Sequence, residues 1–276
     1  MAEVTVALIR EVRELTGAGM SDVKKALVEA GGDKAKAIDE LRKKGAAKAM
    51  KRADERHATN GLVAAAEGAM IELACETDFV AKNEQFQELA GEIVAHAAKV
   101  RPASLEALLA ETLSDGRTVQ ASIEALNAVI GEKIELRNLV VFDGKVAAYL
   151  HRRASDLPAQ IGVLVAFEGD GDAAAEAARG AAMQVSAMRA QYVSRDAVPA
   201  DLVENERSVA EALAKKEGKP EAALPKIIDG RVNGFFKEVV LLEQSAVREP
   251  KRTVKALLDE AGATITGFAR FEVGSS

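Results

Sequence analysis

Residues 60–83 read NGLVAAAEGAMIELACETDFVAKN, and this stretch decides the fold. Its apolar residues recur with a period of two up to Cys75, and the dipeptide Glu67-Gly68 interrupts them. Two such runs around a short glycine-containing turn predict a β-hairpin. The next residues repeat with a helical period, which predicts a helix from about Glu84 to Val100 with one apolar face of Phe86, Leu89, Ile93 and Ala97.

The same order of elements recurs later in the chain. Residues 144–153 (GKVAAYLHRR) and 161–170 (IGVLVAFEGD) resemble a second pair of strands, and a helical pattern runs from Ala173 to Gln191. Residues 133–153 (KIELRNLVVFDGKVAAYLHRR), which include the first of these two segments, are predicted to be rich in strand with a turn at Asp143-Gly144. A hairpin followed by a helix, twice, predicts two related α+β halves with antiparallel sheets.

Helical patterns flank and interrupt these halves. The first 45 residues predict three short helices, the first with an apolar stripe of Val4, Leu8, Val12 and Leu15. An antiparallel helical hairpin is predicted at about 199–236, with stripes of Leu202, Val209 and Leu213 and of Leu224, Ile228, Val232, Phe235 and Val239. The predicted division is 1–54 for a three-helix domain and basic linker, 55–139 for a first core subdomain, and 140–276 for a second that contains the hairpin.

Composition restricts the class of protein. The chain has 276 residues, is 48% hydrophobic, and carries a net charge of −6. We expect a soluble cytoplasmic protein, because no apolar run approaches the ~20 residues of a membrane span. An acidic chain is a poor default binder of nucleic acid. Residues 42–56 contrast with this balance, since they hold seven basic and two acidic residues, and we interpret them as a solvated linker.

The sequence offers few groups for catalysis. The three histidines, His57, His96 and His151, have no metal-binding spacing, and no phosphate-binding glycine loop is present. Cys75 is the single cysteine and is interpreted as a small buried strand residue. We therefore predict a protein without enzymatic activity, without a metal and without a cofactor of its own.

The segment ETDFVAKN, residues 76–83, stands out at the junction between the predicted hairpin and helix. Thr77 or Asp78 has the chemistry of a helix N-cap, in which case Phe79 is a buried staple residue. Alternatively, Phe79 between a carboxylate and Lys82 is an exposed anchor for a protein partner. The residue pattern alone supports both interpretations equally.

Two long segments carry a resemblance to a known family. VRELTGAGMSDVKKAL (12–27) and IELACETDFVAKN (71–83) resemble the signature segments of the bacterial elongation factor Ts family, and the likeness extends to GKP, DGR and TGFARFEVG further on. The resemblance implies a guanine-nucleotide exchange factor that binds elongation factor Tu and promotes its release of GDP. It also implies a helical N-terminal domain, two α+β core subdomains and a helical-hairpin insertion.

The resemblance also implies which residues contact the partner. Thr77, Asp78, Phe79 and Val80 would disturb the magnesium and phosphate site of elongation factor Tu, with Phe79 inserted and Asp78 as a polar contact beside it. Arg13 and Met20 would touch the nucleotide-binding domain of the partner, and Tyr149 and His151 would face its third domain. Magnesium and GDP or GTP belong to the partner, and neither direct nucleic-acid binding nor membrane binding is expected. The alternative hypothesis is a nucleic-acid-binding helical protein that uses the basic region within residues 1–56.

Overall fold

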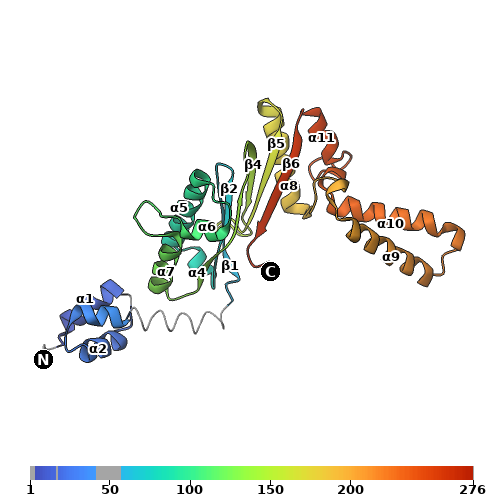
Figure 1. Cartoon of the computed structure of the whole chain (residues 1–276). Coiled ribbons are helices and arrows are strands. Elements are labelled where there is room, and N and C mark those ends of the chain that lie inside the picture. The colour runs from blue at the N-terminus through green and yellow to red at the C-terminus, as the bar shows by residue number, and fades with distance from the viewer. Residues whose placement is uncertain (1–3, 17, 42–56, 276) are drawn as a thin grey trace.

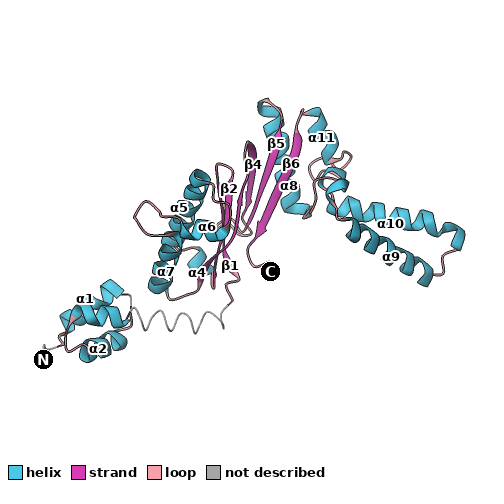
Figure 2. Cartoon of the chain, in the orientation of Figure 1, coloured by secondary structure: helices cyan, strands magenta, loops and turns pink. Residues whose placement is uncertain are grey.

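The computed structural model describes residues 4–16, 18–41 and 57–275. Within these ranges the chain forms two three-stranded antiparallel sheets, and helices accompany each of them (Figures 1 and 2). The predicted α+β class with antiparallel sheets is confirmed. None of the helices in the described ranges combines the length and the hydropathy that a bilayer crossing requires.

The first half begins with the predicted hairpin, β1 (Asn60–Ala66) and β2 (Ala69–Cys75). Glu67 and Gly68 both have positive φ, at 41° and 85°, which matches the right-handed twist of the strands that they join. The chain continues through α4 (Asp78–Ala81), α5 (Glu84–Val100), α6 (Leu105–Ala110) and α7 (Val119–Ile130) to β3 (Ile134–Val141). β3 pairs antiparallel with β2, so the sheet order is β1-β2-β3.

The second half repeats this plan. β4 (Lys145–His151) and β5 (Ile161–Glu168) pair antiparallel, α8 (Gly171–Met188) follows, and β6 (Thr264–Glu272) completes the order β4-β5-β6. α11 (Val254–Glu260) comes directly before β6. Even the helix ends agree, because Arg101 after α5 and Arg189 after α8 both adopt the left-handed conformation. These matching features support the predicted repeat.

The two sheets pack against each other through small and branched side chains. A buried cluster of Val63 and Met70 from the first sheet with Leu164 from the second lies between them. Helices α5, α6 and α7 therefore cover the outer face of one sheet, while α8 covers the outer face of the other (Figure 1).

The Asp143-Gly144 turn connects the two sheets rather than two strands of one sheet. β3 runs to Val141, beyond the predicted boundary between residues 139 and 140, and pairs only with β2 within the described sheets. β4 begins at Lys145 and pairs with β5. We therefore place the transition between the halves at residues 142–144. Strand partners depend on contacts distant in sequence, which a local turn pattern does not reveal.

A buried carboxylate lies at this packed interface. Glu72 is 2% exposed and stands on the same face of β2 as Met70. Asn138 Nδ2 donates a hydrogen bond to Glu72 Oε2 at 2.7 Å, whereas Oε1 has no hydrogen-bond partner among the described residues. Burial raises the pKa of Glu72, and the Asn138 hydrogen bond opposes that effect only in part.

We predict that Glu72→Gln stabilises the fold at neutral pH by about 1 kcal/mol, since an uncharged amide keeps the Asn138 contact without a buried charge. Because the folded-state pKa of Glu72 is raised, its contribution to stability is greatest below its ordinary value of 4.5 and falls as the pH rises through the folded pKa. Urea denaturation of both proteins at pH 5 and pH 8 measures this difference.

Glu135→Gln is the matched control for that experiment. Burial opposes ionisation of Glu135, but hydrogen bonds from Lys133 and Arg137 outweigh it and lower its pKa. Its stabilising contribution is therefore present at pH 8 and is lost as the pH falls, so Glu135→Gln should destabilise the protein at pH 8. Equal effects of both substitutions at both pH values would contradict the assignment for Glu72.

The helical hairpin projects away from the second half (Figure 1). It consists of α9 (Ala200–Lys216) and α10 (Leu224–Val239), close to the predicted limits. The buried residues of α9 are Ala210 and Ala214, whereas the predicted Val209 and Leu213 are largely exposed. Phe236 rather than Phe235 is buried in α10. Small alanines allow the two helices to approach closely, so the larger side chains beside them stay outside.

The N-terminal helices form a separate small core. α1 (Val6–Thr16), α2 (Met20–Glu29) and a helical segment at residues 34–41 bury a cluster of Ile9, Val12, Val23, Ala26, Leu27, Ala37 and Leu41. Val12 belongs to the predicted stripe, but Leu15 is exposed. The predicted basic linker at residues 42–56 lies outside the described residues.

Candidate functional site

The segment predicted as the site forms one helical turn, α4, between the hairpin and α5. Thr77 is its N-cap, and its hydroxyl accepts a hydrogen bond from the backbone N–H of Val80 at 3.4 Å. Asn83 caps the next helix by accepting hydrogen bonds from Gln85 N and Phe86 N. Two caps within seven residues fix the backbone on both sides of Phe79.

The loop before β3 holds this turn from the side. The Thr77 hydroxyl donates to the Glu132 carboxylate, with oxygen–oxygen distances of 3.0 and 3.1 Å. The Glu76 carboxylate accepts from the backbone N–H of Lys133 at 2.6 Å. Asn60 Nδ2, at the start of β1, donates to the carbonyl of Glu76 at 2.8 Å. Contacts from two separate parts of the chain, the loop before β3 and the start of β1, therefore fix the entry into α4.

Cys75 lies beneath the turn and is a structural residue, as predicted. Its side chain is buried, and its thiol donates to the carbonyl of Thr77 at 3.2 Å. Burial, together with the nearby Glu132 charge, raises its pKa to about 12. The thiol is therefore protonated at neutral pH and is a poor nucleophile.

Phe79 and Val80 face opposite environments. The Val80 side chain is 5% exposed and packs in the core of the first half, so it anchors the turn from beneath. The Phe79 side chain is 79% exposed. This exposure excludes the buried staple and leaves the exposed anchor as the interpretation of Phe79. A large aromatic side chain in water on a backbone held this firmly is suited to inserting into a partner.

Asp78 belongs to an ion-pair chain that reaches the second half. Lys82 Nζ lies 3.2 Å from an Asp78 carboxylate oxygen and 2.7 Å from an Asp156 carboxylate oxygen. Hydrogen bonds to Asp156 and then Asp78 raise the pKa of Lys82, and the Lys82 contact lowers the pKa of Asp156. These groups lie at the surface, so the contacts orient Asp78 more than they stabilise the fold.

Tyr149 and His151 lie two residues apart on β4, so they share one face of the second sheet. Their rings stack with centroids 6.2 Å apart, and the Tyr149 hydroxyl is 3.4 Å from His151 Nδ1. Tyr149 is half-buried against the core beneath α8, whereas His151 is exposed. The loop that follows His151 contains Asp156 and therefore contacts α4 through Lys82.

Arg13 and Met20 lie in the N-terminal helices. Arg13 is in the last turn of α1, and Met20 is the first residue of α2 with 51% of its surface exposed. Both are accessible to a partner. The N-cap of α2 is Gly19, which makes no side-chain capping bond.

Sequence reasoning missed the residues that hold the site. Glu132, Lys133 and Asp156 are distant from Phe79 in the sequence, and nothing in their own surroundings marks them. Only the pairing of β3 with β2 brings the loop before β3 to the end of β2. A recognisable signal was the i, i+4 spacing of Asp78 and Lys82, which permits an ion pair on one helix face.

The described residues contain no group of three or more His, Cys, Asp or Glu side chains that could hold a metal ion. The α4 segment instead offers an exposed aromatic ring, a surface carboxylate and a fixed backbone. These features suit recognition of another macromolecule.

Comparison with known proteins gives a consistent result. The family described as "Elongation factor TS" matches residues 76–275. The chain belongs to the elongation factor Ts family. Over all 276 residues, and over the full length of each relative, it is 61% identical to "Elongation factor Ts" of Nocardia farcinica and 59% identical to that of Rhodococcus erythropolis. The Mycobacterium tuberculosis relative of the same name is 56% identical over the same span.

Membership of the elongation factor Ts family agrees with the architecture and places the chain among translation elongation factors. The family match begins at Glu76, so it covers the first half from the α4 segment onward, the second half and the helical hairpin. The N-terminal helices and the strands β1 and β2 fall outside that match but inside the full-length similarity to the relatives.

Proposed function

We propose that this chain is the guanine-nucleotide exchange factor of elongation factor Tu. The observation that carries the proposal is Phe79, which is 79% exposed on a turn fixed by Thr77, Glu132 and Cys75. In this proposal Phe79 inserts beside the magnesium and phosphate site of the partner, and Asp78 makes a polar contact next to it. The chain itself forms and breaks no covalent bond.

Thermodynamic linkage relates the affinity of an exchange factor for its partner to the partner's affinity for GDP. If it binds nucleotide-free partner more tightly than GDP-bound partner, GDP weakens its binding by the same factor. Each tenfold of this coupling requires ~1.4 kcal/mol of differential contact. A side chain that is already ordered before binding supplies that contact at a lower entropic cost than a mobile one. The contacts that fix α4 support this role for Phe79.

Two further surfaces complete the proposed interface. Arg13 and Met20 are exposed on the N-terminal helices and would contact the nucleotide-binding domain of the partner. Tyr149 and His151 form a stacked aromatic pair on β4 and would face the partner's third domain. Contacts distant from the nucleotide would strengthen binding to both states of the partner. Phe79 would make binding to the nucleotide-free state tighter than binding to the GDP-bound state.

Stopped-flow release of a fluorescent GDP from purified elongation factor Tu tests the proposal. Addition of this protein should accelerate release, and excess GDP should dissociate the complex in return. Unchanged release with a folded, cognate pair of proteins would overturn the proposal.

The alternative function, nucleic-acid binding by residues 1–56, is tested in parallel. RNA binding by the full chain, measured by fluorescence anisotropy at several salt concentrations, should be weak if the exchange function is correct. Tight binding that falls steeply with salt would favour the alternative.

A further inference from the structure

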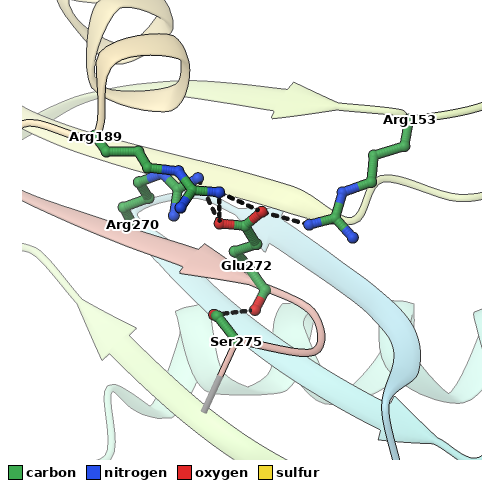
Figure 3. Close-up of polar contacts among 5 residues, drawn as sticks. All are labelled: Arg153, Arg189, Arg270, Glu272 and Ser275. Carbon is green, nitrogen blue, oxygen red and sulfur yellow. Dashed lines mark hydrogen bonds and ion pairs between the residues drawn. The ribbon is translucent and has the colours of Figure 1, made fainter.

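Three guanidinium groups converge on one buried carboxylate at the end of the second sheet. Glu272, the last residue of β6, is 7% exposed (Figure 3). Arg270 Nη2 lies 2.7 Å from its Oε2, Arg189 Nη2 lies 3.1 Å from the same oxygen, and Arg153 Nη2 contacts Oε1 (Figure 3). We call these four residues the arginine cluster.

The arginine cluster has more positive groups than its single carboxylate can neutralise. Three positive groups meet a single negative one, which leaves a local charge of +2 in a chain whose net charge is −6. The Arg153 and Arg189 side chains are 45% and 70% exposed, and each directs only Nη2 to Glu272. A guanidinium has five N–H donors, so most donors of these two groups face solvent.

Strand register places the cluster on the same sheet face as Tyr149 and His151. Tyr149 pairs with Val163, which pairs with Arg270, and His151 pairs with Ile161, which pairs with Glu272. Paired residues project to the same face of an antiparallel sheet, and neighbouring strands lie ~4.8 Å apart. The aromatic pair on β4 and the cluster on β6 therefore project from one face of the sheet, two strand spacings apart, with the buried Val163 and Ile161 of β5 between them.

The backbone at Arg189 adopts a strained conformation that also occurs at Arg101. Arg189 ends α8 with φ 54° and ψ 38°, a left-handed conformation in which glycine is the usual residue. A non-glycine residue there costs roughly 1 kcal/mol. Arg189 reaches Glu272 from this position, and Arg101 reaches Asp143 from the equivalent one.

We propose that the arginine cluster binds an aspartate or glutamate side chain of the protein partner, as an extension of the surface formed by Tyr149 and His151. The inference rests on the proposed function. Arg153 and Arg189 are the residues that touch the incoming carboxylate, while Glu272 and Arg270 position them. Planar guanidinium groups match the two oxygens of a carboxylate, and the excess positive charge attracts it.

Arg189→Gly tests the inference without removing a residue that the fold needs. Glycine favours the left-handed conformation, and Glu272 keeps Arg153 and Arg270 as partners. Arg101→Gly is the matched control, because Arg101 occupies the equivalent left-handed position after α5 and pairs with the exposed Asp143. Both variants lose one positive charge and one side chain at the same kind of helix end.

The readout is the affinity of each variant for nucleotide-free elongation factor Tu at low and at high salt, measured by surface plasmon resonance. We expect Arg189→Gly to bind about 10-fold more weakly at low salt, equivalent to ~1.4 kcal/mol. High salt should shrink the difference. Arg101→Gly should bind like the unmodified protein, and Arg153→Gln should reproduce the effect of Arg189→Gly.

Equal binding by the Arg189→Gly and Arg101→Gly variants would overturn the inference while leaving the exchange function intact. Loss of binding to RNA rather than to the partner would overturn it as well, since the cluster would then be a phosphate site. Absence of any binding by the unmodified protein would instead remove the proposed function on which the inference rests.

Discussion

Replacing Phe79 with alanine is expected to slow the stimulated release of GDP from elongation factor Tu by about 30-fold, which corresponds to the ~2 kcal/mol typical of an aromatic residue that dominates an interface. The ring is 79% exposed in the unbound chain, so its removal leaves no cavity. The free energy of unfolding should change by less than about 0.5 kcal/mol, as for other surface substitutions. Stopped-flow exchange and urea denaturation of the same preparation measure the two effects separately.

Phe86→Ala is the matched control for Phe79→Ala. Phe86 lies seven residues further along the chain and is fully buried in the core of the first half. Its truncation should cost about 3–5 kcal/mol of stability through cavity formation. Loss of exchange in both variants with an equal loss of stability would return Phe79 to a structural role. Retained exchange in a folded Phe79→Ala variant would indicate that the other proposed contacts, rather than Phe79, accelerate GDP release.

Gly162→Ala is expected to destabilise the protein by about 2 kcal/mol, because it forces a methyl group into the contact between the two sheets. A Cβ atom at Gly162 would lie 2.8 Å from Met70 Sδ and 3.1 Å from Leu150 Cδ2, and closer still to Val63 Cγ1. Val63 is stiff and buried, so it has little room to move. The backbone of Gly162 does not require glycine, since its φ is not in the left-handed region. Glycine is needed at position 162 because the neighbouring side chains leave no space for a methyl group. Thermal or urea denaturation measures the loss of stability in the alanine variant.

Gly180→Ala makes the same change of side chain, but we expect it to stabilise the protein rather than destabilise it. Gly180 lies within α8, and a Cβ atom there meets nothing within 4 Å. Alanine should stabilise this helix by about 0.5–1 kcal/mol, because glycine loses more backbone entropy on folding.

A double variant of Gly162→Ala with Val63→Ala should be less destabilised than the sum of the two single variants. Strict additivity would contradict a steric clash at this interface.

Local patterns sufficed for most of the elements. The hairpin of β1 and β2 and the bounds of α5 follow from residues adjacent in the sequence, because a period of two, a two-residue turn and a helical period are each properties of a short segment. The repeat of hairpin and helix was visible for the same reason. The identity of Phe79 as an unusual residue also came from its local position, a large aromatic between charged neighbours.

Tertiary structure decided what those patterns left open. Whether Phe79 is buried or exposed depends on the orientation of α4, which Thr77, Glu132 and the buried Val80 fix together. The equally local turn at Asp143-Gly144 left open which strands pair, and its flanking strands belong to different sheets.

Local sequence patterns were enough to predict the α+β class, the two related halves, the helical hairpin and the segment that holds the candidate site. Which strands share a sheet, which side of a helix is buried and which charges meet became clear only from the packed fold. The convergence of Arg153, Arg189 and Arg270 on Glu272 illustrates the difference, because these residues span much of the second half of the chain. Hydrophobic periodicity is a property of residues that are close in the sequence, whereas contacts between distant residues arise only when the strands and helices pack.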